Sequence, residues 1–219
     1  MNERKRLTRA EMRDRTRSGL LEAATRVFAR RGYRAASMDE IAEEAGYSKG
    51  AVYSNFESKE DLFLTLFQEH MAEHLAATTK AFSEGATPQE RLTSGSRHLS
   101  LMAEEDQEWC LLLMEFWSHA AREPKLREAF AADYDSWRQS VARLVESQAA
   151  ELGLPLAIPA DEIASAIIAL FEGFVLQKMI QPDRFPADYF GSMLMTFLAG
   201  VAAMSGADLA QVVQGEPAR

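Results

Sequence analysis

The stretch that most constrains the fold of this chain is SMDEIAEEAGYSKGAVYSNFESKEDL, residues 37–62. Ser37 is a candidate N-cap, because its hydroxyl can accept a backbone N–H and Glu40 follows at the spacing of a capping box. Gly46 is placed to end that helix in the left-handed conformation, which glycine adopts without steric cost. Ser48 then precedes a second helical run. The sequence therefore predicts two short helices joined by a tight turn, the helix-turn-helix pattern.

The second of these helices, expected from Lys49 to about Asn55, has a surface suited to DNA. Lys49 and Tyr53 supply polar groups, and Gly50 lets the backbone come close to another surface. Apolar residues on the other side of the helix can fix it against its neighbour. These properties are typical of a DNA-reading helix without being unique to it.

Two overlapping segments, LLEAATRVFARRGYRAASMDEIA and IAEEAGYSKGAVYSNFESKEDL, resemble the helix-turn-helix signature of the TetR family of transcriptional repressors. The resemblance is specific, because roughly twenty positions agree in type and spacing. It implies a repressor that binds palindromic, double-stranded operator DNA as a homodimer and is released by a small-molecule effector. It also implies that Lys59 holds the phosphate backbone of the DNA. The expected DNA-binding residues are Ser37, Ser48, Lys49, Gly50, Tyr53, Asn55 and Lys59.

Charge is distributed unevenly along the chain, whose formal net charge is −9. Residues 1–60 hold thirteen Lys and Arg against ten Asp and Glu, a balance of +3, whereas the remainder has a balance of −12. A locally basic face is sufficient to attract phosphates, since charges beyond a Debye length of about 8 Å are largely screened. The first twenty residues predict a flexible basic arm leading into a helix, with a solvated tail as the alternative for the first ten. The basic residues of this arm are Arg4, Lys5, Arg6, Arg9, Arg13, Arg15 and Arg17.

Helical periodicity without strand alternation predicts an all-α fold of about nine helices. We expect a DNA-binding helix-turn-helix domain with the basic arm at residues 1–58, a ligand-binding and dimerisation domain at 59–206, and a polar tail at 207–219. A helix of about twenty residues from Lys59 should connect the two domains without a flexible linker. Expected helix limits elsewhere are about Arg13 to Arg31, Asp161 to Gln181 and Ala187 to Met204.

The single cysteine, Cys110, excludes an internal disulfide. Neither a signal peptide nor an apolar run of about 18 residues is apparent in the sequence. These features predict a cytoplasmic protein with no membrane partner. Separately, we expect no cofactor.

The last two expected helices carry more apolar surface than one neighbour can cover, which indicates a partner. By the resemblance, this partner is a second copy of the chain in a four-helix interface, while a monomeric core is the alternative. Gly173, Gly191, Ala199 and Gly200 would permit close approach. The expected interface residues are Ile167, Phe171, Phe174, Val175, Phe190, Met193, Leu194, Phe197 and Val201.

Glu115 and Glu172 interrupt strongly apolar helices in the expected ligand domain. A buried carboxylate must be paired, hydrogen-bonded or protonated, so each has a partner inside the protein or receives one from a ligand. If both line a pocket, a hydrophobic or cationic amphiphilic effector fits; otherwise they pair at a helix interface. The candidate pocket residues, whose aromatic members could equally be core, are Trp109, Leu113, Glu115, Phe116, Trp117, Phe130, Tyr134, Trp137, Phe171 and Glu172.

His70, Glu73 and His74 spell H-x-x-E-H, which matches an inverted zinc-protease motif. Two histidines four residues apart lie on one helical face and can hold a metal with a third ligand. A metal-dependent hydrolase is therefore one alternative function, and metal sensing is another. Because the pattern is short and no downstream ligand cluster accompanies it, we interpret it as a solvated helix face, with no metal ligand and no catalytic residue.

A helical scaffold whose basic arm binds RNA or another protein is a further alternative. Competition with duplex DNA distinguishes it from the preferred interpretation, which is a DNA-binding regulator and not an enzyme.

Overall fold

The structure, a computed structural model, describes residues 8–209 and divides into two compact units. The first unit comprises the chain up to Glu69 together with Leu111–Phe130, and the second comprises His70–Cys110 and the chain from Ala131 onward. Over the described residues there are nine α-helices, one short 3-10 helix and no strand, so the all-α prediction is confirmed. The helices are α1 (Arg9–Ala35), α2 (Met38–Ala45), α3 (Lys49–Asn55), α4 (Lys59–Ser83), α5 (Pro88–Glu105), α6 (Gln107–Ala120), α7 (Pro124–Glu151), α8 (Ala160–Ile180), η1 (Pro182–Arg184) and α9 (Tyr189–Met204).

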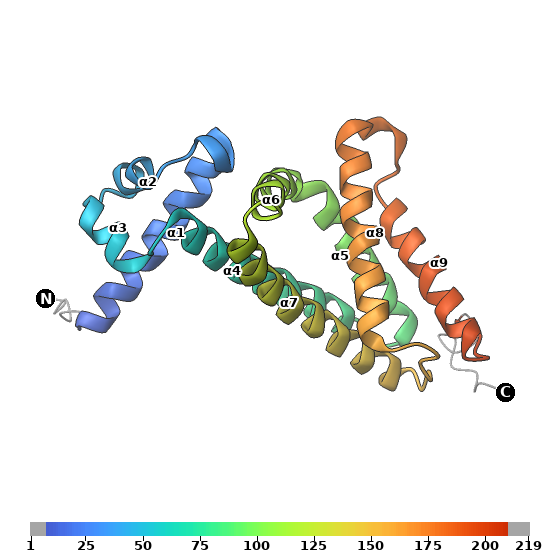
Figure 1. Cartoon of the computed structure of the whole chain (residues 1–219). Coiled ribbons are helices and arrows are strands. Elements are labelled where there is room, and N and C mark those ends of the chain that lie inside the picture. Colours follow the sequence, from blue (N-terminus) through green and yellow to red (C-terminus); the bar gives the residue numbers. More distant parts are fainter. Residues whose placement is uncertain (1–7, 210–219) are drawn as a thin grey trace, which may run out of the picture. The chain divides into compact units, whose positions relative to one another are not determined.

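Helices α1, α2 and α3 lie together in the first unit (Figure 1). The predicted capping box of α2 is present, since the N–H of Glu40 donates to Ser37 Oγ at 3.2 Å and the N–H of Ser37 donates to the Glu40 carboxylate at 3.1 Å. Gly46 ends α2 in the left-handed region, with φ 71° and ψ 24°. The inner faces of the helices meet in a closed core, because Leu20, Ile41 and Val52 are fully buried. The predicted helix-turn-helix is therefore confirmed as a packed unit.

Helix α1 is longer than predicted. It begins at Arg9 because Thr8 forms a capping box with Glu11, four residues before the expected start at Arg13. Its regular geometry is interrupted at Gly32, where φ is 73°. Part of the predicted basic arm, Arg9 to Arg17, is thus helical, while Arg4, Lys5 and Arg6 lie outside the described residues.

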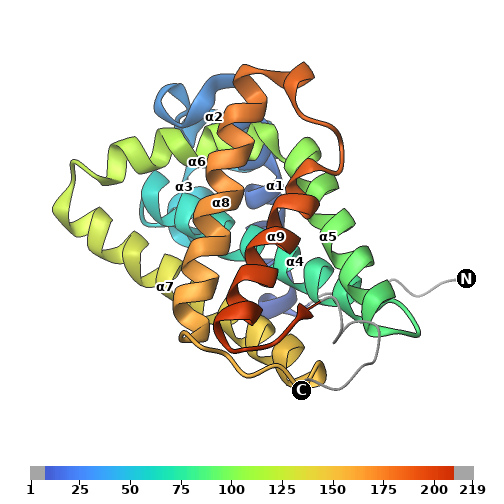
Figure 2. The same ribbon diagram turned by 90° about the vertical axis from the view of Figure 1, so that its right-hand side faces the viewer.

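Helices α5, α8 and α9 form the core of the second unit, and Figure 2 shows α8 and α9 side by side. Phe174, Val175, Phe190 and Leu194 are buried in one cluster with residues of α5. Gly191 allows the close approach of α9 to α5: its N–H donates to Ser100 Oγ at 2.8 Å, and a Cβ added there would lie 2.8 Å from the backbone oxygen of Ser96. This glycine, expected at the partner interface, therefore serves the interior of the protomer.

Helix α8 is the one helix in residues 8–209 that is long and apolar enough, by length and composition, to cross a membrane. This differs from the expectation that no such apolar run exists, because the run continues past Glu172 and Lys178. A third of its most apolar window is buried inside the protomer. The other residues of that window are part-buried or exposed, so part of the apolar surface is available to something outside the protomer.

The chain remains packed beyond α9. Ala207 and Leu209 are buried against Ala202, so these first residues of the expected polar tail, 207–219, are packed. The rest of that tail lies outside the described residues. Helices α4, α6 and α7 each contain residues of both compact units, and the expected functional division at residue 58 stays a prediction.

Candidate functional site

The outer face of α3 is polar, exposed and free of bulky side chains near its start. Ser48, Lys49, Gly50, Tyr53 and Ser54 are all exposed, and the Tyr53 side chain is 56% accessible. Around Gly50, a Cβ would meet one atom within 4 Å, the Ser48 hydroxyl at 3.9 Å. No packing inside the protein therefore requires a glycine here, whereas a close external surface would.

Arg17 of α1 fixes the end of α3. Its guanidinium donates to the backbone oxygen of Asn55 and to the hydroxyl of Thr65, both at 3.1 Å, and lies 4.5 Å from the centre of the Phe56 ring. These contacts join α1, α3 and α4, so α3 is held as a rigid element. The sequence analysis assigned Arg17 to a flexible basic arm, and no local pattern indicates this structural role.

Lys59 has a different environment from the one predicted. Its ammonium donates to the backbone oxygens of Tyr33 at 2.8 Å, Arg34 at 3.4 Å and Ala36 at 2.9 Å. It also lies 4.5 Å from the centre of the Tyr33 ring. Burial lowers the pKa of Lys59. In this structure Lys59 therefore closes the turn between α1 and α2 and is not free to bind phosphate.

The remaining predicted DNA-binding residues divide between capping and exposed positions. Ser48 Oγ accepts the N–H of Ala51 at 3.2 Å and caps α3. The Asn55 amide donates to the backbone oxygen of Ala51 at 2.8 Å, while its Oδ1 is buried without a hydrogen-bond partner. Lys49 is exposed and paired with Asp39, and that hydrogen bond raises the pKa of Lys49. Lys49 and Tyr53 are thus the predicted side chains with the freest access to a ligand.

In the second unit, Tyr134, Trp137 and Glu172 come together. The Tyr134 hydroxyl donates to Glu172 Oε1 at 2.6 Å, and the Tyr134 and Trp137 rings pack edge to face with centroids 5.2 Å apart. Burial raises the pKa of Glu172. The nearby guanidinium of Arg138 is bonded to Asp135 and Asp161. A part-buried carboxylate beside two aromatic rings has the chemistry of a site for an organic cation.

Two family models match this sequence, one over the helix-turn-helix region and the other over the second half of the chain. One, described as "Bacterial regulatory proteins, tetR family", matches residues 20–66. The other, described as "BetI-type transcriptional repressor, C-terminal", matches residues 88–203, more than half of the chain. The chain belongs to the TetR family of transcriptional regulators. The predicted resemblance is confirmed.

Transcriptional regulators with similar sequences or structures agree with this assignment. The transcriptional activator FasR of Mycolicibacterium smegmatis is 37% identical over 103 residues. The match covers 47% of this chain and 47% of FasR, so the chain spans about half the length of this relative. A TetR-family regulator from Mesorhizobium loti has the same fold, with a TM-score of 0.68, 24% identity, and coverage of 90% of this chain and 98% of that one. A regulator from Saccharomonospora viridis, solved in complex with choline, has a TM-score of 0.61 and 23% identity. The match covers 84% of this chain and 96% of that one. At these identities the two structures establish the fold.

The candidate pocket residues of this TetR-family chain do not form one cluster inside either unit. In the first unit Phe116 is fully buried, stacked on Phe63 and packed edge to face on Phe130. The Glu115 carboxylate accepts the N–H of Arg34 at 3.4 Å, beside Gly32. The sequence left open whether Glu115 pairs inside the protein or with a ligand, and in the structure it has an internal partner. Phe116 and Phe130 are core residues. Leu113 is part-buried and Trp117 exposed in that unit, and Trp109 lies in the second unit, as do Phe171 and Glu172.

The predicted dimer-interface residues fall into two groups, one buried within the protomer and one partly exposed. Five of the nine are buried within the protomer and belong to its own core, because α8 and α9 pack on α5. They are Phe174, Val175, Phe190, Leu194 and Val201. Ile167, Phe171, Met193 and Phe197 are partly exposed. Gly173 and Gly200 face open space, since no atom lies within 4 Å of an added Cβ at either position.

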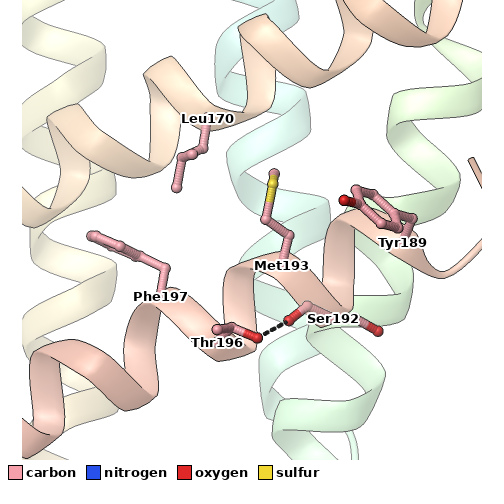
Figure 3. A pocket seen from close by; sticks show the side chains of 6 residues that line it. All are labelled: Leu170, Tyr189, Ser192, Met193, Thr196 and Phe197. Atoms are coloured by element: carbon pink, nitrogen blue, oxygen red, sulfur yellow. Dashed lines mark hydrogen bonds between the residues drawn. The ribbon is translucent and has the colours of Figure 1, made fainter.

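A surface hollow of about 490 Å³ lies on the α8–α9 side, and Figure 3 shows the side chains that line it. None of its residues was predicted for the effector pocket, whereas Met193 and Phe197 were predicted for the dimer interface. The lining residues are Leu170, Tyr189, Ser192, Met193, Thr196 and Phe197. The hollow lies on the apolar outer face of α8 and α9, so it belongs to the surface that a partner could cover.

Proposed function

We propose that this TetR-family chain is a cytoplasmic repressor that binds a palindromic operator as a homodimer, with the α3 helix of each protomer in a major groove. Binding over a promoter would exclude RNA polymerase. A small hydrophobic or cationic amphiphilic effector would release the DNA by binding better to the dimer whose two α3 helices are wrongly spaced. Two-fold symmetry requires half-sites about one or more helical turns apart.

The observation that carries this proposal is the exposed α3 face, where Tyr53 projects beside an open Gly50. Helices that read DNA need polar side chains and space for the sugar-phosphate backbone. The Arg17 and Lys59 contacts hold α3 and the α1–α2 turn in place. Rigid support of this kind favours specific contact, because less conformational entropy is lost on binding.

The dimer is supported by the composition of the α8–α9 surface. The outward positions include Gly173, Ala199 and Gly200, which are small, and the part-buried Met193 and Phe197. Small residues let two helix pairs approach closely, and apolar neighbours gain about 25 cal/mol for each Å² removed from water. A homodimer therefore accounts for the apolar surface of α8 without a membrane.

The effector class is supported by the Tyr134–Trp137–Glu172 group. Within the described residues no cationic side chain pairs with Glu172. A quaternary or primary ammonium could supply that missing charge and contact the aromatic faces. The choline complex of the Saccharomonospora viridis relative gives independent reason to test cations of this type.

Electrophoretic mobility shift with the DNA upstream of the chain's own gene tests the main proposal. Tyr53→Ala should weaken operator binding by at least about tenfold, or 1.4 kcal/mol. Thr25→Ala, a neutral change at an exposed α1 position, is the matched control and should bind as the wild type. Wild-type binding should fall steeply with salt, because phosphate contacts release counterions. Equal affinity of Tyr53→Ala and wild type would overturn the assignment of α3.

A further inference from the structure

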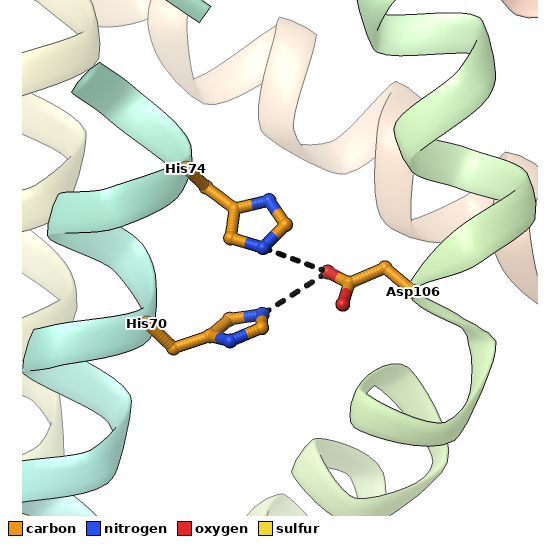
Figure 4. Close-up of side chains that lie close together, drawn as sticks. All are labelled: His70, His74 and Asp106. Carbon is orange, nitrogen blue, oxygen red and sulfur yellow. Dashed lines mark hydrogen bonds and ion pairs between the residues drawn. The ribbon is translucent and has the colours of Figure 1, made fainter. Parts of the chain in front are cut away.

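His70 and His74 of α4 face Asp106, the residue that follows α5 (Figure 4). The Nε2 atoms of His70 and His74 lie 3.1 Å and 3.7 Å from Asp106 Oδ2. One ligand atom from each of the three residues can be chosen so that all lie within 4.8 Å of one another. All three side chains are part-buried, with exposed fractions of 22%, 27% and 15%. The interpretation of this motif as a solvated helix face is therefore wrong for both histidines.

These separations match the edges of a metal coordination polyhedron. Zinc binds imidazole nitrogen and carboxylate oxygen at about 2.0–2.2 Å, so two ligands of a tetrahedral zinc ion are about 3.4 Å apart. The two nitrogen–oxygen distances of 3.1 Å and 3.7 Å lie on either side of this value. The ligand atoms of the two histidines also lie within 4.8 Å of each other, so one ion can contact all three residues.

The surroundings of the two rings favour metal binding over a simple ion pair. His74 Nδ1 lies 2.8 Å from the sulfur of Met102, so an N–H there can donate to the thioether and leave Nε2 with its lone pair. That lone pair points toward the Asp106 carboxylate. A cation between the nitrogen and the carboxylate oxygen would bind both atoms. Ligating histidines commonly donate their other ring N–H in this way, which fixes the ring and its tautomer.

Further contacts orient the site. The indole of Trp109 stacks on His70 with ring centroids 4.0 Å apart, which limits rotation of that imidazole. His98 lies one turn before Met102 on α5, and its Nε2 is buried without a hydrogen-bond partner. The site thus has two oriented imidazoles and one carboxylate.

We propose that His70, His74 and Asp106 bind one divalent transition-metal ion per chain, with zinc as the best match. Imidazole and carboxylate together suit zinc, whereas magnesium and calcium prefer sites built from oxygen alone. The fourth position is open to water. Glu73, the acidic residue of H-x-x-E-H, is exposed and is not among the ligands.

Such an ion would join two segments that are distant in sequence. His70 and His74 lie on the long α4, just after that helix leaves the first compact unit at Glu69. Asp106 lies between α5 and α6. Metal binding would therefore fix α4 to the α5–α6 turn and stabilise the second unit by mass action.

Calorimetric titration of untagged, chelator-treated protein with zinc chloride tests the proposal. The wild type should bind one zinc per chain, and His70→Gln and Asp106→Asn should each weaken binding by at least about tenfold. Glu73→Gln, an exposed change within the same motif, is the matched control and should bind like the wild type. Cobalt chloride should give the wild type, but neither ligand variant, the intense visible absorption of four-coordinate Co²⁺.

Circular dichroism without metal checks that each variant is folded. If His70→Gln is unstable, Asp106→Asn carries the test, because asparagine retains the shape of the aspartate that follows α5. No saturable binding by the wild type, or wild-type affinity in Asp106→Asn, would overturn the proposal. These measurements involve no DNA, so their outcome is independent of the proposed operator binding.

Discussion

The hydroxyl of Tyr134 donates a hydrogen bond of 2.6 Å to Oε1 of Glu172, and this bond connects α7 to α8. Tyr134→Phe keeps the ring and removes the donor. We expect the free energy of unfolding to fall by about 1–3 kcal/mol, because a part-buried acceptor is left unsatisfied. Urea denaturation at one protein concentration measures this, and Ser136→Ala on the exposed side of α7 is the control. An unchanged midpoint would contradict the expected role of the bond.

Glu172 should also make stability depend on pH. Burial raises its pKa in the folded state, so the folded protein holds this proton more tightly than the unfolded chain does. The contribution of Glu172 to stability is then greatest below the unfolded pKa of about 4.3 and falls as pH rises through the folded pKa. Glu172→Gln should gain stability relative to the wild type across that window. Parallel pH profiles for the two proteins would refute this expectation.

Substitutions of Lys59 and Lys49 should have different effects, the first on stability and the second on DNA binding. Lys59→Gln removes an ammonium that holds three backbone oxygens, and should lower stability by about 1–2 kcal/mol. Lys49→Gln removes an exposed ion pair that solvent and salt screen, so the melting temperature should barely change while operator affinity falls. Thermal melts and mobility shifts on both variants test the pair. A stable Lys59→Gln protein would show that its ammonium is not structural.

Gly50→Ala should change stability and DNA binding in opposite directions. Alanine within a helix is more stable than glycine by about 0.5–1 kcal/mol, and nothing in the protomer blocks the added methyl group. The same methyl group would obstruct a DNA backbone close to α3, so we expect affinity to fall by about tenfold. A variant that is more stable and binds equally well would place DNA elsewhere.

Cys110 should react slowly while the protein is folded. Burial, with the charges of Asp106 and Glu172, raises its pKa to about 12. At pH 8 roughly one thiol in ten thousand would then be in the reactive thiolate form. An aromatic disulfide reagent should therefore modify the folded protein much more slowly than the urea-unfolded protein. Equal rates would show that the thiol is accessible.

Local signals made the first unit predictable. Ser37, Glu40 and Gly46 determine the limits of α2 through contacts within four residues, so sequence spacing was sufficient. The role of Arg17 could not be read in the same way, because its partners Asn55 and Thr65 are 38 and 48 residues away. A charged side chain looks the same in sequence whether it binds phosphate or a backbone oxygen.

The second unit was predictable in pattern and less so in detail. Periodicity identified α8 and α9 as apolar, but it could not assign each face to α5 or to a partner. Phe174 and Phe190 are therefore core residues where the sequence suggested an interface. Asp106 illustrates the same limit, since it lies 36 residues from His70 and the fold alone brings the two together.

Three glycines offer a test of which faces of α8 and α9 meet a second copy. Gly173 and Gly200 have open space where a side chain would project, so Gly173→Leu and Gly200→Leu should fold as protomers but fail to dimerise. Gly191→Ala should instead destabilise the protomer by about 1–3 kcal/mol, because its methyl group would meet the Ser96 backbone oxygen. Sedimentation equilibrium reports the dimer and circular dichroism the fold. If both leucine variants remain dimers of wild-type affinity, the partner binds another surface and the apolar face of α8 requires a different occupant.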